Sequence, residues 1–382
     1  MQLSPVLTAT GTYPFVRLEE AKQRLAAQGA ELLDFGKGDP REETDPRIRR
    51  ALVDSLEPLS TYPLAEGLPE LRSAVARWCE RRFGVTLDPD TELIPTYGSK
   101  EAIFHLAQVV LDRDGDKRLV LTTEPGYPVY DRGALFAGGE VEQLPLREEN
   151  GFLPDLESVA ADTWRRTAIV WINYPNNPTG AVAPLEFLEE LADLALKHDF
   201  LVAADEAYTE LWFDAPPHSA LEVRDRSRVA VFQTLSKRSS MTGYRSGFVA
   251  ASPELVGALR QYRPTVGTAP QEFVQRASIV AWDDEEHVER TRAIYRRKRE
   301  VLLTVLARKG IRVVASEATM YLWLEVPDGE TSEGLAERLL ENGLIVSPGT
   351  FFGPSGDGYW RLALVPTEEE CRRAAKILEE VL

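Results

Sequence analysis

The residues most suited to chemistry surround a single lysine, Lys237. Thr234 and Ser236 come just before this lysine, and Arg245 follows it eight positions later. An amine in this setting can attack an aldehyde, while hydroxyl groups and a guanidinium can hold a phosphate. The segment therefore predicts covalent chemistry between Lys237 and a phosphorylated aldehyde.

Two segments upstream of the lysine could supply further polar groups. The first is Tyr174-Pro175-Asn176-Asn177-Pro178-Thr179-Gly180, and the second is Asp205-Glu206-Ala207-Tyr208. Taken singly, Asp205 could be a turn or cap residue, and the Asn-Pro-Thr-Gly sequence could be an ordinary turn. Their joint occurrence with the lysine segment is what favours a shared site.

Short apolar runs alternate with amphipathic ones in the middle of the chain and must position these groups. The runs that have the length and character of buried strands are 119–123, 168–172, 200–204 and 229–232. Between them, 184–198 has helical periodicity, and such alternation predicts a parallel sheet covered by helices on both sides. Ligands collect beyond the carboxyl ends of such strands, so we expect Asn177, Asp205 and Lys237 to meet there.

The C-terminal part of the chain predicts a smaller α+β domain. A long polar helix is expected over 283–309. Its predicted buried stripe consists of Val288, Tyr295, Leu302 and Leu306. Beyond it, strand-like runs at 321–326 and 359–364 alternate with helical runs at 332–341 and from Thr367 onward.

Composition disfavours a nucleic-acid or membrane binder. The chain has 382 residues, of which 43% are hydrophobic and 27% charged, and its net charge is −17. This length favours two domains, and this charge disfavours DNA, RNA and anionic membranes. We interpret the basic cluster 296–299 as a solvated helix face rather than a nucleic-acid patch. The acids expected to pair with it are Glu285, Glu286, Glu289 and Glu300.

Neither a membrane segment nor a metal site is predicted. No run reaches the ~18 apolar residues of a membrane helix, and the N-terminus lacks the features of a signal peptide. Cys79 and Cys371 have no metal-type spacing, so two reduced thiols in a cytoplasmic protein are expected. The histidines, which are scattered without ligand spacing, are His105, His198, His218 and His287.

Together, the lysine segment and the two upstream segments resemble the fold-type-I, class I/II aminotransferases that use pyridoxal phosphate. The resemblance covers nearly the whole chain. It implies an α/β fold, the PLP-dependent transferase fold type I, with a mostly parallel seven-stranded sheet sandwiched by helices plus a smaller α+β domain. It also implies a large cofactor-binding domain over 46–284, a small domain over 285–382, and an N-terminal arm, 1–45, that packs with the small domain.

The same resemblance assigns roles around the cofactor ring. Lys237 would form an imine with the aldehyde and then act as the proton shuttle. Asp205 would pair with the pyridine nitrogen and keep it protonated, so that the ring can accept electrons. Asn177 and Tyr208 would donate to the ring oxygen O3′, and Tyr127 would stack on the ring.

The cofactor phosphate would lie in a cup where a small-residue turn enters a helix expected over 102–110. Such a turn aims free backbone N–H groups at an anion. The residues assigned to the cup are Gly98, Ser99 and Lys100 from this turn, with Thr234, Ser236 and Arg245 from the lysine segment. The resemblance also implies that Tyr62 reaches the phosphate of a neighbouring subunit, and hence a homodimer with shared active sites.

The substrate α-carboxylate is assigned to three residues. The planar guanidinium of Arg361 can grip a carboxylate bidentately. The resemblance brings the backbone of Gly38 close to the same carboxylate, and Asn177 would help to hold it. This grip would leave the Cα–H bond exposed to Lys237, which favours proton removal over loss of carbon dioxide.

The far end of the substrate is assigned to Lys100, which could meet a distal carboxylate. Alternatively, Lys100 pairs with a surface acid such as Glu101. Lys37 stands where the family usually has a neutral residue, and it either adds a second cation to the pocket or faces solvent.

These features predict an aminotransferase that moves an amino group between an acidic amino acid, such as N-succinyl-diaminopimelate, and 2-oxoglutarate or glutamate. Residues 13–15, 17–19 and 38–40 most resemble the succinyldiaminopimelate transaminases, and Gly98 to Glu101 also resembles prokaryotic aspartate and LL-diaminopimelate aminotransferases. The alternatives are an aspartate or other amino-acid aminotransferase, a C–S lyase of the same fold, and a non-catalytic ligand-sensing domain.

Overall fold

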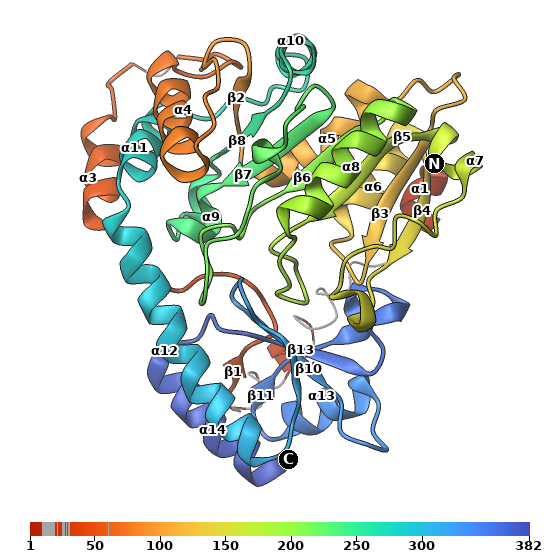
Figure 1. Ribbon diagram of the computed structural model, residues 1–382. Coiled ribbons are helices and arrows are strands. Elements are labelled where there is room, and N and C mark those ends of the chain that lie inside the picture. Colours follow the sequence, from red (N-terminus) through yellow and green to blue (C-terminus); the bar gives the residue numbers. More distant parts are fainter. Residues whose placement is uncertain (10–19, 21, 25–26, 28, 30, 60) are drawn as a thin grey trace.

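Apolar strands alternating with helices form a seven-stranded sheet in the upper part of the molecule (Figure 1). The structure is a computed structural model that describes residues 1–382 except 10–19, 21, 25–26, 28, 30 and 60. Among the strands of this sheet, β8 is the one that runs antiparallel to its neighbours, so the predicted mostly parallel sheet is confirmed. In order across the sheet, the strands are β2 (Leu93–Thr96), β8 (Gly247–Ala250), β7 (Val229–Thr234), β6 (Leu201–Asp205), β5 (Thr167–Asn173), β3 (Leu119–Glu124) and β4 (Glu140–Pro145).

Helices cover both faces of this sheet because its central strands are apolar on both sides. Along β5, Val170 and Ile172 face one helical layer, whereas Ile169 and Trp171 face the other. The first layer contains α3 (Pro46–Asp54), α4 (Pro69–Phe83), α8 (Leu185–His198) and α11 (Glu272–Asp283). The second layer contains α5 (Ser99–Val110), α6 (Val129–Ala137) and α10 (Pro253–Tyr262).

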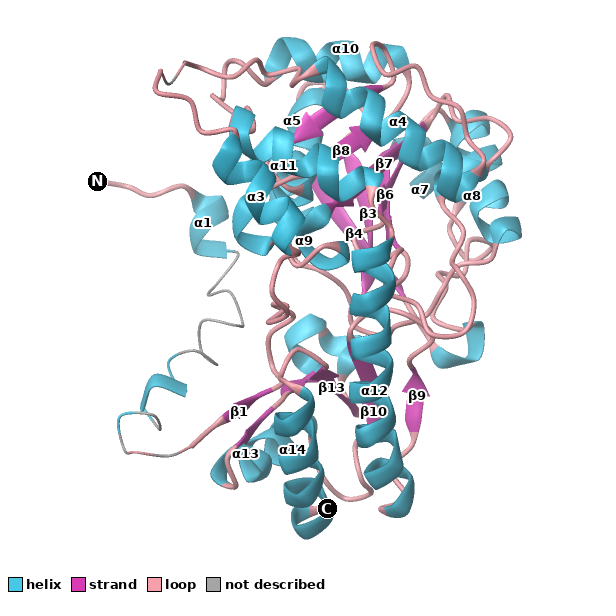
Figure 2. Cartoon of the chain, turned by 90° about the vertical axis from the view of Figure 1, so that its left-hand side faces the viewer, coloured by secondary structure: helices cyan, strands magenta, loops and turns pink. Residues whose placement is uncertain are grey.

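A second core surrounds a four-stranded antiparallel sheet in the lower part of the molecule (Figure 1). Its strands in order are β12 (Ser347–Pro348), β13 (Tyr359–Ala363), β10 (Tyr321–Glu325) and β9 (Val313–Ala315). The helices packed around it are α12 (Glu286–Arg308), α13 (Ser332–Glu341) and α14 (Glu368–Val381). Helices α12 and α14 run side by side (Figure 2). The smaller α+β unit expected from the sequence is therefore present.

The segment that begins at Leu33 joins this second core. Strand β1 (Leu33–Asp34) pairs in parallel with β11 (Leu344–Ile345), and Phe35 N donates to Ile345 O at 2.9 Å. The domain boundaries, 1–45, 46–284 and 285–382, stay predictions. The other described helices are α1 (Pro5–Ala9), α7 (Ala161–Arg166) and α9 (Leu235–Arg238). Short 3-10 turns occupy Glu148–Asn150, Ala220–Glu222, Thr242–Tyr244, Gly349–Phe352 and Pro354–Gly356.

The long helix expected over 283–309 is α12, and the predicted stripe of Val288, Tyr295, Leu302 and Leu306 is fully buried. The pairing predicted for the basic cluster 296–299, with glutamates 285, 286, 289 and 300, is wrong for two of its members. Lys298 is 1% exposed and bonds Glu42, and Arg297 pairs with Glu368 at 3.0 Å. These two cations therefore tie α12 to segments far away in the sequence. Arg296 and Arg297 are exposed, as expected for a solvated face, whereas Lys298 is not.

Cys79 and Cys371 are both buried and unpaired, one in each of the two cores, which agrees with the reduced thiols predicted from the sequence. In the part of the chain that the structure describes, no helix combines the length and apolar character needed to cross a membrane.

Candidate active site

A cavity of about 770 Å³ lies where the carboxyl ends of β5, β6 and β7 face the four-stranded sheet. Most of the predicted site residues meet there, although they come from segments far apart in the sequence. Those that line the cavity are Gly38, Ser99, Lys100, Tyr127, Asn177, Asp205, Tyr208, Thr234, Ser236, Lys237, Arg245 and Arg361. Gly98 and Tyr62 do not belong to the lining.

Lys237 lies on α9, a helix of 4 residues that follows β7 directly. Thr234 caps this helix, because its hydroxyl accepts from Ser236 N at 3.1 Å. The same hydroxyl is within 3.0 Å of Ser246 O, to which it donates. In this structure Thr234 therefore holds the lysine helix in place, in addition to lining the cavity.

The surroundings of Lys237 make its amine easier to deprotonate. Its side chain is partly open to the cavity, yet its Nζ lies deep among protein groups and donates to Gly38 O. Burial lowers the pKa of Lys237 to about 8, although the Asp39 carboxylate opposes this shift. The cations that lower it further are Arg361, Arg245 and Lys100.

Asp205 ends β6 as a buried carboxylate. Burial raises its pKa to about 6, and the hydroxyl of Tyr130, which donates to Oδ2 at 2.8 Å, opposes this rise. Asn173 fixes the backbone here by donating to the carbonyl of Asp205 at 2.7 Å. A cation beside this carboxylate would favour its ionised form, so the site suits a protonated ring nitrogen.

Tyr130 is a site residue that the sequence analysis did not identify. It lines the cavity and stacks on Trp171, with ring centroids 4.8 Å apart. The available signal was its position three residues after Tyr127 in a segment already assigned to the site.

Arg361 is 1% exposed and held in one orientation before any substrate binds. Its guanidinium donates to Asn177 Oδ1 at 2.7 Å and to Gly36 O at 2.7 Å. The guanidinium carbon also lies 4.1 Å from the ring centroid of Tyr321 and 4.5 Å from that of Phe352. Such stacking and hydrogen bonding preorganise a planar cation to receive a carboxylate.

Tyr208 and Tyr321 share a hydrogen bond in the cavity, and of these two residues the sequence analysis identified only Tyr208. Their hydroxyls lie 2.9 Å apart, and burial raises the pKa of Tyr208, which therefore stays protonated and able to donate. The sequence analysis places Tyr321 only in a strand-like run of the smaller domain. A Cβ at Gly38 would overlap the Tyr321 hydroxyl, which explains why this position needs glycine.

The predicted phosphate cup is a cationic corner at the start of α5. Gly98 precedes the helix with a φ of +71°, and a side chain there would overlap the Arg245 guanidinium. Arg245 in turn donates to Thr242 O at 2.8 Å. A helix N-terminus beside a guanidinium attracts an anion through both its N–H groups and its dipole.

Lys100 lies in the first turn of α5 and lines the cavity, with Nζ 5.6 Å from the ring centroid of Tyr127. Lys100 is exposed to solvent over part of its side chain, but desolvation by the surrounding protein, and then the charge of Arg245, lower its pKa. Glu101, the surface acid considered as its alternative partner, pairs with Arg263 at 2.8 Å. This geometry favours the interpretation in which Lys100 serves the cavity.

Two predictions concern parts of the chain that this cavity does not include. Tyr62 is 100% exposed, so its role in a neighbouring subunit stays a prediction. The N-terminal motif at 13–15 and 17–19 lies outside the described residues. Lys37, by contrast, does line the cavity.

The arrangement fits the phosphorylated aldehyde that the sequence predicts. An amine of lowered pKa, a buried carboxylate and a cationic helix N-terminus share one cavity, and glycine at position 98 leaves room beside Arg245. Arg361 supplies a further cation for the carboxylate of a second, smaller ligand. Such a cavity can hold an amino acid against a cofactor and exchange a proton with it.

Comparison with known proteins supports the same assignment. Residues 30–378 match the family model for aminotransferase class I and II. The LL-diaminopimelate aminotransferase of Nitratidesulfovibrio vulgaris is 40% identical over 387 residues, which cover 98% of this chain and 99% of the relative. An aminotransferase of Neisseria meningitidis has a TM-score of 0.92 and 38% identity over 100% of both chains. A protein of Thermus thermophilus, titled a probable N-succinyldiaminopimelate aminotransferase, has a TM-score of 0.89 and 32% identity over 97% of this chain and 100% of its own.

Proposed function

Because this chain belongs to the aminotransferase class I and II family, we propose that it moves an amino group between a diaminopimelate-type amino acid and 2-oxoglutarate, with pyridoxal 5′-phosphate as cofactor. The aminotransferase of fold type I predicted from the sequence is confirmed by the family match. The observation that carries the proposed amino transfer with this cofactor is the meeting of Lys237, Asp205 and Arg361 in one cavity.

The cofactor is assigned to residues that already face the cavity. When bound, pyridoxal phosphate supplies an electrophilic carbon for amines and a ring that withdraws electrons from the substrate α-carbon. Asp205 would hold the ring nitrogen, Asn177 and Tyr208 the ring oxygen, and Tyr127 the ring face. The phosphate would be held by Gly98, Ser99, Ser236 and Arg245, with Thr234 fixing the helix that carries Ser236.

Lys237 moves the proton in this proposal. A pKa of about 8 lets Nζ both accept and return a proton near neutral pH. Arg361 and Asn177 would hold the substrate α-carboxylate and turn the Cα–H bond towards Nζ. This orientation supports amino transfer over decarboxylation.

The far end of the substrate supports a diaminopimelate-type donor. Diaminopimelate ends in a carboxylate and an ammonium, and the cavity offers Lys100 and Lys37 to the first and Asp39 to the second. N-Succinyl-diaminopimelate carries an additional carboxylate in place of that ammonium, and Asp39 would repel it. The Nitratidesulfovibrio relative, an LL-diaminopimelate aminotransferase by name, supports the unmodified LL form.

A side-by-side substrate panel tests this function. Initial rates of 2-oxo acid and amino acid formation would be measured with LL-diaminopimelate, N-succinyl-diaminopimelate, aspartate and alanine, each with 2-oxoglutarate. We expect the highest kcat/KM with LL-diaminopimelate. Equal rates for alanine and the acidic donors would contradict the substrate proposal, and pyruvate release from cystathionine without amino transfer would favour the lyase alternative.

Lys100→Met is expected to impair acidic donors selectively. The charged hydrogen bond that Lys100 would lose is worth about 1.5–3 kcal/mol, so kcat/KM for LL-diaminopimelate and aspartate should fall by about 10- to 100-fold. Alanine, which has no distal carboxylate, should be used as before. The matched control is Lys197→Met, which removes an exposed lysine on α8. If the Lys100 variant has unchanged selectivity, Lys100 does not contact the distal carboxylate of the substrate.

We also propose a homodimer in which Tyr62 of one chain completes the phosphate cup of the other. The large apolar side chains exposed in the segment around Tyr62 support this arrangement; they are Val53, Leu56, Leu59 and Leu64. Sedimentation of the purified protein at micromolar concentration should give twice the chain mass of 42.7 kDa. A fully active monomer would contradict the shared site.

A further inference from the structure

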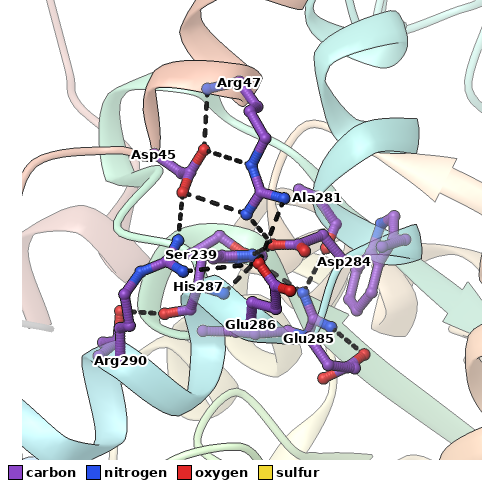
Figure 3. A network of polar contacts seen from close by, with 12 residues as sticks. Asp45, Arg47, Ser239, Ala281, Asp284, Glu285, Glu286, His287 and Arg290 are labelled. Carbon is purple, nitrogen blue, oxygen red and sulfur yellow. Dashed lines mark hydrogen bonds and ion pairs between the residues drawn. The ribbon is translucent and has the colours of Figure 1, made fainter.

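A polar network connects the lysine helix α9 with the junction between α11 and α12 (Figure 3). The two residues that follow Lys237, namely Arg238 and Ser239, are both 2% exposed. Arg238 donates to Ala281 O at 2.6 Å and to Glu285 Oε1 at 2.5 Å. Ala281 lies near the end of α11 and Glu285 directly precedes α12, so the residue next to Lys237 is bonded to the junction itself.

Ser239 reaches the same junction through His287. Ser239 is the C-cap residue of α9, and its Oγ lies 2.8 Å from His287 Nε2. On the other side of the ring, His287 Nδ1 lies 2.6 Å from Asp284 Oδ2. Because a carboxylate can only accept, Nδ1 carries the proton, and the neutral ring accepts at Nε2 from the Ser239 hydroxyl. Burial, and then the charge of Arg238, lower the pKa of His287 and favour this neutral form.

The network continues from Asp284 to the start of α3. Arg47 donates to Asp284 Oδ2 at 2.9 Å and to Asp45 Oδ1 at 3.1 Å. Asp45 also accepts from Arg290 of α12 at 2.5 Å. Figure 3 shows these side chains gathered around the junction. The network therefore connects the α11–α12 junction with both α3 and α9.

This junction connects the two cores that form the active site. Helix α11 packs in the core on one face of the seven-stranded sheet, whereas α12 packs in the core of the four-stranded sheet. Lys237 comes from the first part and Arg361 from the second. A helix of 4 residues is too short to hold its own geometry, so α9 depends on outside contacts. The contacts of Arg238 and Ser239 therefore influence where Lys237 stands relative to Arg361.

We propose that His287 is a positioning residue for amino transfer. Through Ser239 it fixes the lysine helix α9 relative to the α11–α12 junction, and so holds Lys237 Nζ where it can exchange a proton with the substrate bound at Arg361. This inference rests on the proposed function, because it assigns His287 a role in the proton transfer of Lys237. His287 does not touch the cavity itself, and it acts through Ser239 alone.

Two conservative variants break the link from opposite sides. Ser239→Ala removes the hydroxyl, and His287→Asn keeps a donor near the Nδ1 position for Asp284 but no longer reaches Ser239. His287→Gln can place a polar atom near Nε2 and is the rescue variant. Thr291→Val is the matched control, since it removes a buried hydroxyl of α12 that donates to His287 O at 2.8 Å.

The first measurement is the rate at which the apoprotein captures pyridoxal phosphate, followed by absorbance as a function of pH. For the wild type, we expect the rate to rise with pH around a midpoint near 8, where Lys237 loses its proton. A loosened helix admits water to the amine, so Ser239→Ala and His287→Asn should raise this midpoint by about 0.5–1 pH unit. Thr291→Val should leave it unchanged, and His287→Gln should lie close to the wild type.

The second measurement is steady-state kinetics of the reconstituted enzymes. Ser239→Ala and His287→Asn should each lower kcat by about tenfold with little change in KM, because misplacing the amine affects proton transfer more than binding. The double variant should be no worse than either single variant, since both remove one link. A wild-type midpoint and wild-type kcat in both single variants, with only a lower melting temperature, would overturn the inference. A wild-type protein that captures no pyridoxal phosphate would overturn the proposed function, and this inference with it.

Discussion

Lys237→Ala is expected to lower the kcat of amino transfer by about 10⁴-fold or more, because it removes both the nucleophile and the proton carrier. The phosphate cup around Arg245 and the carboxylate of Asp205 remain, so the variant should still bind pyridoxal phosphate without a covalent bond. Borohydride reduction followed by mass spectrometry measures this directly. The peptide that contains residue 237 should carry the cofactor in the wild type and not in the variant.

Lys237→Arg is the control that separates charge from chemistry. Arginine keeps the positive charge but cannot give up its proton in a protein. We therefore expect the same loss of kcat as with alanine, although the charge at this position is preserved. An arginine or alanine variant that keeps a tenth of the wild-type kcat would show that another group carries the proton.

The direction in which the pKa of Lys237 is shifted explains why this amine is suited to nucleophilic attack and proton transfer. A lysine at its ordinary pKa of about 10.5 has roughly 0.3% of its amine neutral at pH 8. Burial disfavours the charged form, and with a pKa of about 8 roughly half of the amine is neutral at that pH. Reactivity should therefore be lost as pH falls below 8 and should level off above it.

The residues that follow the strands could be predicted because local patterns determine where they lie. The apolar runs that end before Asn177, Asp205 and Lys237 are strands β5, β6 and β7, and parallel strands deliver their carboxyl ends to one edge. The roles of these residues, however, came from the resemblance, since a single Asp or Lys after a strand is ordinary.

The residues that hold the site together could not be predicted, because their partners are distant in the sequence. Tyr130 bonds an aspartate 75 positions away, and Tyr321 bonds a tyrosine 113 positions away. The lysine of the basic cluster, Lys298, bonds Glu42 across 256 positions, so a local rule for helix charges chose the wrong partners. His287 has one local partner, Asp284, three positions before it, but its contact with Ser239 spans 48 positions and depends on the packing of α9 against the α11–α12 junction.

Arg361→Ala is expected to lower kcat/KM for every amino donor, whatever its side chain. Two charged hydrogen bonds to the α-carboxylate are lost, at about 1.5–3 kcal/mol each, so the decrease should be about 100-fold or more. Asn177 Oδ1 also loses the donor that Arg361 provides, whereas Gly36 O keeps the hydroxyl of Ser347, so a small loss of stability should accompany the substitution. Steady-state kinetics with LL-diaminopimelate and alanine, together with thermal unfolding, measure both effects.

Arg361→Lys tests whether the planar fork or the charge alone matters. Lysine keeps the charge but cannot grip a carboxylate bidentately, so most of the kcat/KM loss should remain. The two variants should differ in a second respect, because the Arg361 charge lowers the pKa of Lys237. Removing that charge in Arg361→Ala should raise the pH midpoint of cofactor capture, whereas Arg361→Lys should leave it near 8. A loss confined to acidic donors would show that Arg361 binds the far end of the substrate and not the α-carboxylate. The Cα–H bond would then have a different orientation relative to Lys237.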